Sequence, residues 1–227
     1  MLVKNWMSKG VITVDVDDSM SDATRIIKEN NISMLPVMKK GKLVGVITDR
    51  DLKRASASDA SSLEIHELLY LLSTIKVKKI MSKNPITVPL DFTVEETAEI
   101  LMKNKISGVP VVDEGGQVVG VITQNDIFKV LISLTGISNR GVQFALMLDD
   151  RPGSIKEVTD VIRKYGGRMV SILSSYDQVE KGYRKVYIRF YGIDRSKLPQ
   201  IKEEVKEKGK LLYMVDQREN KREIYSL

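Results

Sequence analysis

The sequence predicts a mixed α/β protein with two copies of a β-α-β-β-α unit and a different β-α-β-β-α-β unit after them. The run Leu-Val-Gly-Val-Ile-Thr-Asp-Arg-Asp-Leu at 43–52 recurs as Val-Val-Gly-Val-Ile-Thr-Gln-Asn-Asp-Ile at 118–127. Apolar residues alternate in short runs or recur at helical spacing between turn residues, which favours strands and helices in turn. From residue 139 the pattern no longer follows the repeat. These observations indicate a tandem repeat followed by a ferredoxin-like unit.

Composition narrows the classes of protein that the chain can represent. It has 227 residues and no cysteine, which excludes disulfides, thiolate metal sites and a cysteine nucleophile and fits a reducing compartment. The net charge of +6 is spread among mixed signs, which favours a solvated surface over a nucleic-acid patch. No apolar run approaches the roughly 20 residues of a membrane span, and the start lacks a signal peptide. We therefore expect a cytoplasmic protein that binds neither nucleic acid nor membrane.

Each repeat is expected to follow one order of elements. A short β-branched strand precedes a helix that begins with a capping box, Ser19 with Asp22 or Thr93 with Glu96. An apolar hairpin and a last helix follow. The predicted strands are 11–14, 35–38 and 43–47 in the first repeat, and 86–88, 109–112 and 118–122 in the second.

Between the repeats lies an insertion. Residues 55–62 are small and polar and are expected to form a loop. Ile65, Leu68, Leu69 and Leu72 then recur at helical spacing, which predicts an amphipathic helix. His66 lies in this helix and is read as a surface or interface residue, because the sequence has no other histidine or cysteine with which to build a metal site.

The C-terminal unit begins with an alternating strand at 142–148. A turn with Pro152 and Gly153, a helix at 155–165, strands at 168–176 and 183–191, a helix from Ser196 to Gly209 and a strand at 210–215 follow. The charged residues after Asp216 are expected to fray. The predicted domains are the first repeat (1–56), the insertion (57–76), the second repeat (77–136), the ferredoxin-like unit (139–216) and a charged tail (217–227).

The Thr-x-x-Asp segments, Thr48 with Asp51 and Thr123 with Asp126, carry the chemistry of the repeats. A threonine followed three residues later by an acid is a common helix cap. The same residues would lie at the carboxyl end of a strand, where α/β proteins bind ligands. Carboxylate oxygens suit a ribose diol, and a hydroxyl beside free helix N–H groups suits a phosphate. Capping alone and ligand binding both remain open for one copy, and the recurrence favours a ligand.

These residues resemble a tandem pair of CBS domains, a Bateman module. The resemblance is carried by Met7 and Met81, by Ile32-Ser33-Met34-Leu35-Pro36-Val37, by Ile106-Ser107-Gly108-Val109-Pro110-Val111, and by both Gly-Val-Ile-Thr-x-x-Asp runs. It implies two units related by a pseudo-twofold axis, with clefts that bind AMP, ADP, ATP or S-adenosylmethionine as regulatory ligands and not as catalytic cofactors.

The resemblance also implies which residues line each cleft. One site would combine Thr48, Arg50 and Asp51 with Thr87 and with Ser107, Gly108, Val109 and Pro110. The other would combine Thr123 and Asp126 with Thr13 and with Ser33, Met34, Leu35 and Pro36. Arg50 could reach a phosphate, whereas Asn125 at the matching position carries no charge. The two sites are therefore expected to differ in ligand or in occupancy.

The C-terminal unit resembles an ACT domain. The turn Asp150-Arg151-Pro152-Gly153-Ser154-Ile155 carries this resemblance, which implies an amino-acid site beside Asp150, Arg151, Gly153 and Ser154 at a dimer interface. Gly153 would let the backbone approach such a ligand, although a turn that simply starts a helix explains the same residues. The order CBS-CBS-ACT with its inserted helix resembles the AcuB-type acetoin-utilisation proteins.

These features favour a non-catalytic regulatory sensor that forms a homodimer, acts on an unidentified partner protein and is linked to acetoin or related carbon metabolism. A structural or interaction protein with vestigial clefts is the alternative. An enzyme is disfavoured, because the sequence shows no nucleophile–base pair, no metal-ligand cluster and no Gly-rich phosphate loop.

Overall fold

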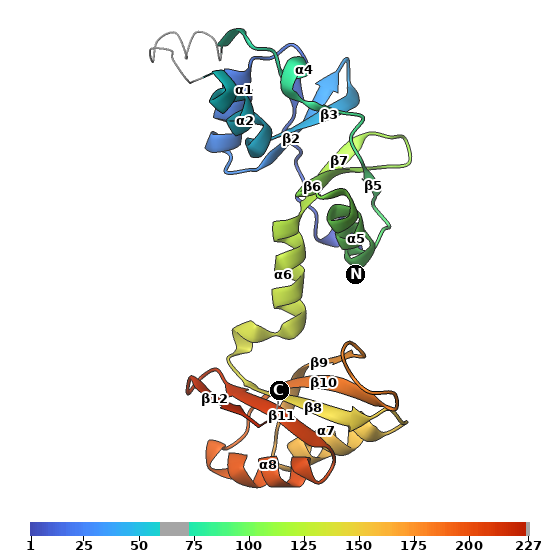
Figure 1. Cartoon of the computed structure of the whole chain (residues 1–227), viewed down its shortest axis with the longest axis vertical. Coiled ribbons are helices and arrows are strands. Elements are labelled where there is room, and N and C mark those ends of the chain that lie inside the picture. The colour runs from blue at the N-terminus through green and yellow to red at the C-terminus, as the bar shows by residue number, and fades with distance from the viewer. Residues whose placement is uncertain (60–72, 226–227) are drawn as a thin grey trace. The chain divides into compact units, whose positions relative to one another are not determined.

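The computed structural model describes residues 1–59 and 73–225, and it divides into two compact units, Met1–Phe128 and Lys129–Leu227 (Figure 1). The amphipathic helix expected around Ile65 and His66 lies outside the described residues. Within the described ranges, no helix is long and apolar enough to cross a membrane.

Two hairpin-centred sheets form the first unit. Its elements are η1 (Val3–Asn5), β1 (Val14–Asp15), α1 (Met20–Glu29), β2 (Met34–Lys39), β3 (Lys42–Thr48), α2 (Asp49–Asp59), α4 (Val77–Ile80), β4 (Ser82–Lys83), β5 (Val88–Pro89), α5 (Val94–Asn104), β6 (Gly108–Val112), β7 (Val118–Thr123) and α6 (Gln124–Thr135). The sheet orders are β1-β2-β3-β4 and β5-β6-β7. Both hairpins have the same register at their carboxyl end, with Met34 opposite Thr48 and Gly108 opposite Thr123. The expected repeat of strands and helices is therefore present, although the first strands are Val14–Asp15 and Val88–Pro89 and not 11–14 and 86–88.

The segments that lead into the two repeats are exchanged between them. Val3, ahead of the first repeat, is fully buried, and its N–H donates to the carbonyl of Phe92 in the second repeat (2.8 Å). Val77, at the equivalent position ahead of the second repeat, is also fully buried, and its N–H donates to the carbonyl of Asp18 in the first (2.9 Å). Each repeat thus completes its core with a residue that the sequence places ahead of the other.

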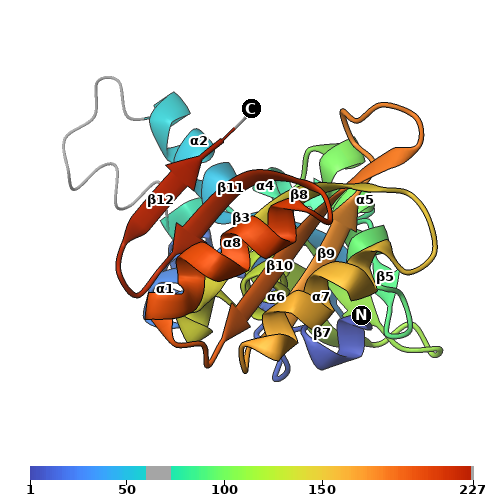
Figure 2. The same ribbon diagram turned by 90° about the horizontal axis from the view of Figure 1, so that it is seen from below.

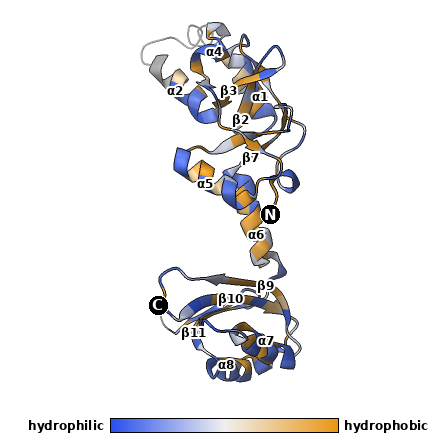
Figure 3. Ribbon diagram, turned by 90° about the vertical axis from the view of Figure 1, so that its right-hand side faces the viewer, coloured by the Kyte–Doolittle hydropathy of each residue, from blue (hydrophilic) through white to orange (hydrophobic). Residues whose placement is uncertain are grey.

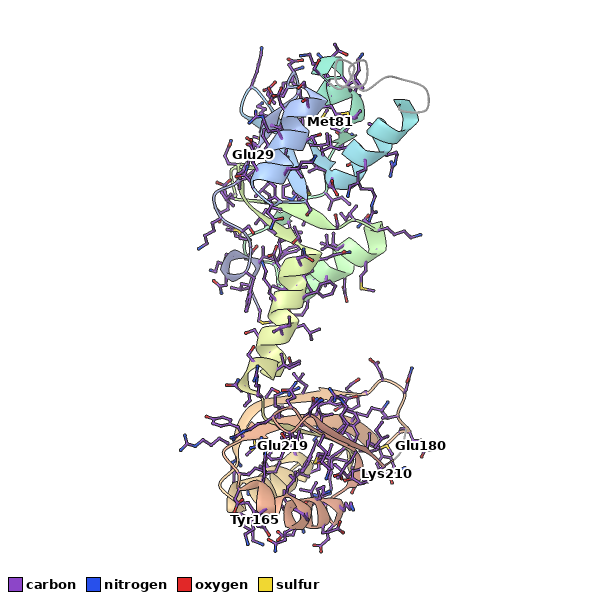
Figure 4. The ribbon with its side chains drawn as sticks, turned by 90° about the vertical axis from the view of Figure 1, so that its left-hand side faces the viewer. Glu29, Met81, Tyr165, Glu180, Lys210 and Glu219 are labelled. Carbon is purple, nitrogen blue, oxygen red and sulfur yellow. The ribbon has the colours of Figure 1, made fainter. Side chains whose placement is uncertain are left out.

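The same exchange explains the glycine in both Val-Gly-Val-Ile-Thr runs. A Cβ added to Gly45 would lie 2.7 Å from Sδ of Met81, the residue labelled in Figure 4, and 2.8 Å from the carbonyl oxygen of Ser82. A Cβ on Gly120 would lie 2.3 Å from Sδ of Met7. Since any side chain would overlap these atoms, glycine lets the lead segment of one repeat pack closely on a strand of the other.

Two local predictions can be compared directly with the structure. The capping boxes at Ser19 and Thr93 are confirmed, with each hydroxyl accepting from the third helical N–H and each acid accepting from the cap N–H. The loop expected at 55–62 is wrong at its start, because α2 continues to Asp59 and crosses the expected boundary at residue 56. Alanine is the best helix former and serine costs only a few tenths of a kcal/mol relative to average residues, so this stretch can extend a helix that is already nucleated.

The second unit is one twisted sheet with two helices. Its elements after α6 are η2 (Ile137–Asn139), β8 (Val142–Asp149), α7 (Ser154–Lys164), β9 (Arg168–Ser175), β10 (Tyr183–Tyr191), η3 (Arg195–Lys197), α8 (Leu198–Lys206), β11 (Lys210–Asp216) and β12 (Lys221–Ile224). The strand order β12-β11-β8-β10-β9 places β8 between β11 and β10, which is the ferredoxin-like arrangement with one strand added at an edge. Figures 1 and 2 show α7 and α8 together on one face.

The alternating strand residues explain this layer. Phe144, Ile188 and Phe190 face the helices and are fully buried, with the rings of Phe144 and Phe190 packed edge to face at 5.0 Å. The expected fraying after Asp216 is wrong, since residues 221–224 pair with β11 as β12. A turn with Asn220 in the left-handed region reverses the chain, and Lys202 on α8 binds Glu223 at 2.7 Å, which holds the added strand.

Candidate functional site

A cleft of about 590 Å³ in the first unit is bordered by both repeats. Residues 82–86, the joining segment that leads from α4 to β5 near the start of the second repeat, form part of its wall. This volume is in the usual range for small-molecule sites. From the first repeat the cleft is lined by Ser33, Met34, Val46, Thr48, Asp49, Arg50, Asp51 and Arg54. The joining segment contributes Ser82, Lys83, Asn84, Pro85 and Ile86, and the second repeat contributes Lys105, Ile106, Ser107, Gly108, Pro110, Thr123, Gln124 and Asn125.

The Thr48–Asp51 cap forms one wall of this cleft. β3 ends at Thr48 and α2 begins at the next residue. The Thr48 hydroxyl donates to Oδ2 of Asp51 (2.6 Å), the Thr48 N–H donates to the same oxygen (3.0 Å), and the Asp51 N–H donates back to the hydroxyl (3.3 Å). Within the described part of the chain, Oδ1 of Asp51 accepts no hydrogen bond that would compete with a ligand. Asp51 therefore takes part in the cap of α2 and also lines the cleft.

The equivalent cap in the second repeat has the same hydrogen bonds but a different environment. The Thr123 hydroxyl and N–H donate to Oδ2 of Asp126 at 2.8 and 3.0 Å. Asp126 is only 5% exposed and is not among the residues that line the cleft, whereas Thr123 is. Residues with identical local roles therefore differ in access to the cleft.

The predicted site residues divide between the cleft wall and its surroundings. Those that line the cleft are Thr48, Arg50, Asp51, Ser107, Gly108, Pro110, Thr123, Ser33 and Met34. Those that do not line it are Thr13, Leu35, Pro36, Thr87, Val109 and Asp126. Strand alternation explains Leu35 and Val109, which are fully buried and point to the face opposite their cleft-lining neighbours. One cleft therefore contains members of both predicted sites.

Backbone hydrogen bonds place each Ile-Ser segment beside the last helix of its own repeat. The N–H of Asp49 donates to the carbonyl of Ser33 (3.1 Å), and the N–H of Gln124 donates to that of Ser107 (2.9 Å). Across the repeats, Cε of Met34 lies 3.4 Å from the position of a Cβ on Gly108. Met34 and Gly108 occupy equivalent positions in the two repeats. The long side chain of Met34 fills space that is open because Gly108 has no side chain.

The charges around the cleft are predominantly positive. Arg50, Arg54, Lys83 and Lys105 line it, and the acids among the lining residues are Asp49 and Asp51. Asp49 is already paired with Lys53, whose Nζ lies 2.6 Å from Oδ2. In residues 1–59 and 73–225, none of the four cations has an ion pair. This excess of positive charge favours an anionic group in the ligand.

Sequence reasoning missed the joining segment. β4 pairs with β3, with Val46 opposite Ser82 and Gly45 opposite Lys83, and this pairing carries Asn84 and Pro85 to the cleft. The signal was the Asn-Pro pair, which marks a turn; Asn84 indeed has a φ of +50°. Because β4 belongs to the sheet of the preceding repeat, alignment of the two repeats alone did not reveal it.

Hydrogen bonds within the turn after β8, and from α7 and the end of β9, hold this turn in place. Arg151 forms a bidentate pair with Glu157 (2.8 and 2.9 Å), and Asp150 accepts from the Tyr176 hydroxyl (3.2 Å). Ser154 donates to the Arg151 carbonyl at 3.1 Å. Gly153 has a φ of +89°, and a Cβ there would meet open space. These contacts are those of a turn that starts α7, and the exposed glycine is the feature that would admit a ligand.

Metal-ligating side chains do not gather in the part of the chain that the structure describes: no group of three or more histidine and acidic residues lies close enough to hold an ion.

Comparison with known proteins assigns the repeats. The CBS domain family model matches residues 3–58 and 77–133. A CBS domain-containing protein of Dictyostelium discoideum is 35% identical over 135 residues, which are 59% of this chain and 93% of that protein. Inosine-5′-monophosphate dehydrogenase of Korarchaeum cryptofilum is 36% identical over 125 residues, which are 55% of this chain and 23% of that enzyme.

Among solved structures, the CBS domain pair of the protein MJ0100, in complex with 5′-methylthioadenosine and S-adenosyl-L-methionine, is similar with a TM-score of 0.50 and 36% identity. The alignment covers 58% of this chain and 95% of that one. The family match ends at residue 133, so it leaves the ferredoxin-like unit unassigned.

Proposed function

This chain belongs to the CBS domain family, and we propose that it is a non-catalytic regulatory sensor that binds an adenosyl ligand in the cleft between its two repeats. The observation that carries the proposal is that one cleft brings Asp51 and Thr48 of the first repeat together with Ser107, Gly108 and Pro110 of the second. The adenosyl compounds bound by the CBS pair of MJ0100 give the ligand class.

We assign roles to the cleft residues by their chemistry. Asp51 accepts from the ribose hydroxyls through the carboxylate oxygen that its cap leaves open. Arg50, with Lys83 on the joining segment, binds a phosphate. The surfaces of Met34, Ile106 and Pro110 contact the adenine. Because the lining cations outnumber the acids, AMP, ADP or ATP fits this cleft better than the cationic S-adenosylmethionine.

Isothermal titration of ligand-free protein with AMP, ATP and S-adenosylmethionine tests the proposal. We expect saturable binding of at least one nucleotide and loss of about tenfold or more in affinity for Asp51→Ala, since a charged hydrogen-bond partner contributes about 1.5–3 kcal/mol. Absence of binding by all three, with mass spectrometry showing that no small molecule copurifies, would reject it.

We further propose that the C-terminal unit is an ACT domain that mediates dimerisation or responds to a small ligand, in the manner of AcuB-type proteins of acetoin metabolism. The ferredoxin-like strand order and the open Gly153 turn support this assignment. Exposed apolar residues on α6 support a homodimer: Leu131, Ile132 and Leu134 are 55%, 50% and 43% exposed, and Figure 3 colours much of this helix hydrophobic. Sedimentation of wild type and Leu131→Glu tests the homodimer.

The alternative is a structural or interaction protein whose cleft binds nothing. The cap hydrogen bonds in both Thr-x-x-Asp segments, which are a common way to begin a helix, favour this alternative. It predicts that Asp51→Ala together with Asp126→Ala leaves partner binding unchanged once their loss of stability is corrected for.

A further inference from the structure

A second cavity, of about 320 Å³, lies in the C-terminal unit. It opens between the start of β8, the end of β10 and the turn that follows β11. Its floor includes Val142, Phe190 and Ile193, and its rim includes Arg140, Arg195 and Arg218. None of the sequence motifs points to it, and it lies outside the residues that match the CBS family.

Two of the three guanidinium groups on the rim carry uncompensated charge. Arg195 is held by Asp216 in a bidentate pair at 2.7 and 3.1 Å, which raises its pKa, and Glu219, labelled in Figure 4, lies 3.8 Å from its Nε. Across residues 129–225, the side chains of Arg140 and Arg218 make neither an ion pair nor a hydrogen bond. An oxyanion can therefore enter the cavity without displacing an existing partner of these two arginines.

The floor is apolar and rigidly held. Val142 and Phe190 are 1% and 0% exposed and close the base of the cavity, whereas Ile193, at 8% exposed, offers apolar surface to a ligand. Gly141 approaches the end of β10 so closely that a Cβ there would lie 2.3 Å from the carbonyl oxygen of Phe190. The carbonyl of Gly141 also accepts from the N–H of Gln217 (3.2 Å), next to Arg218. These contacts fix the backbone beside both unpaired arginines, so the ordering entropy lost on binding is confined to the two side chains.

We propose that this cavity binds a small organic anion, with its carboxylate or phosphate group held by Arg140 and Arg218 and its apolar part against Ile193. Guanidinium groups match the planar or tetrahedral oxygens of such anions. The cavity volume lies at the lower end of the range for small-molecule sites, which fits a compact metabolite and is small for a nucleotide. The site is separate from the cleft between the repeats and does not depend on a ligand there.

Methyl NMR of the full chain tests this proposal at the site itself. Phenyl phosphate and benzoate serve as the anionic probes and benzyl alcohol as the uncharged control. The Ile193 δ1 methyl, assigned through Ile193→Val, is expected to shift saturably with at least one anion and not with the alcohol. Tighter binding of phenyl phosphate indicates a ligand with a phosphate group, and tighter binding of benzoate indicates a carboxylate.

Variants separate the rim from general surface charge. Arg140→Gln and Arg218→Gln are each expected to weaken the Ile193 response about tenfold, the value of a charge-assisted hydrogen bond. Arg222→Gln removes a guanidinium from the edge strand, and Arg50→Gln removes one from the other cleft; both are expected to leave the response unchanged. The proposal is overturned if no anion shifts Ile193, or if the double variant Arg140→Gln/Arg218→Gln responds as wild type does while its remaining methyl spectrum stays native.

Discussion

Asp51 and Asp126 hold the same cap in their repeats, yet they differ in access to the cleft. Each accepts from a threonine hydroxyl and N–H through one carboxylate oxygen. Asp51 lines the cleft, while Asp126 is buried outside it. The chain therefore contains its own control for separating the structural role of this aspartate from its binding role.

Alanine at either aspartate should lower stability, and alanine at Asp51 should also lower ligand affinity. Loss of a helix cap costs about 0.5–2 kcal/mol, so both single variants should unfold at lower urea concentrations than wild type. Nucleotide affinity, measured by titration below the unfolding transition, should fall about tenfold for Asp51→Ala and stay within about twofold for Asp126→Ala. If Asp51→Ala bound the nucleotide within about twofold of wild type, as Asp126→Ala should, both aspartates would act in capping alone.

Gly45→Ala should destabilise the first unit by about 2 kcal/mol, because the added methyl overlaps a backbone oxygen that cannot rotate away. Gly120→Ala should cost less, since its shortest contact is with the flexible end of Met7 and the backbone oxygen of Ser8 lies 3.1 Å away. Urea unfolding of Gly45→Ala and Gly120→Ala, with Gly115→Ala in the hairpin turn as control, measures which variant loses more unfolding free energy. If Gly120→Ala proved the more harmful, the exchange of lead segments would not explain these glycines.

Arg189 should be essential to the stability of the C-terminal unit. It is 4% exposed, and burial lowers its pKa; its side chain donates to the carbonyl of Thr135 (2.7 Å) and to the side-chain oxygens of Gln217 and Gln143 (2.8 and 2.7 Å). Arg189→Leu would leave these part-buried acceptors without donors, at a cost of about 2–3 kcal/mol. Thermal unfolding checks this, with the exposed Arg168→Leu expected to shift Tm by less than about 2 °C.

The edge strand β12 should loosen in acid. Hydrogen bonds from Lys202, Lys221 and Tyr225 lower the pKa of Glu223 from 4.5 to about 2. Because the folded state then binds fewer protons than the unfolded state, this contribution is complete above pH 4.5 and disappears as the pH falls toward 2. Glu223→Gln should therefore destabilise by about 1–2 kcal/mol at neutral pH and have little effect near pH 2.

Hydrogen exchange of the β12 amides across this range measures the loss directly. Protection that stays constant between pH 5 and pH 2.5, after correction for the intrinsic rate, would contradict this role for Glu223.

The repeat, its hairpins and its caps could be predicted because they depend on local patterns. The exchange of Val3 and Val77 could not be predicted. The two lead segments have the same sequence pattern, and this pattern does not indicate into which repeat each of them packs. The joining segment at Lys83 and the Arg140–Arg218 cavity were missed for a related reason, as both arise where chain segments distant in sequence meet. The fraying expected after Asp216 was inferred from charge alone. It failed because residues 221–224 pair with β11 and Glu223 binds Lys202 and Lys221. The ACT assignment, the homodimer and the cytoplasmic location stay predictions.

Photolabelling with 8-azidoadenosine shows directly whether the cleft between the repeats binds an adenosyl compound, because every proposed ligand contains adenosine. We expect adducts on peptides that contain residues 33–34 or 105–110. Excess AMP or S-adenosylmethionine should suppress this labelling, and Asp51→Ala but not Asp126→Ala should reduce it. Adducts confined to peptides outside the cleft, or labelling that no adenosyl compound suppresses, would contradict it.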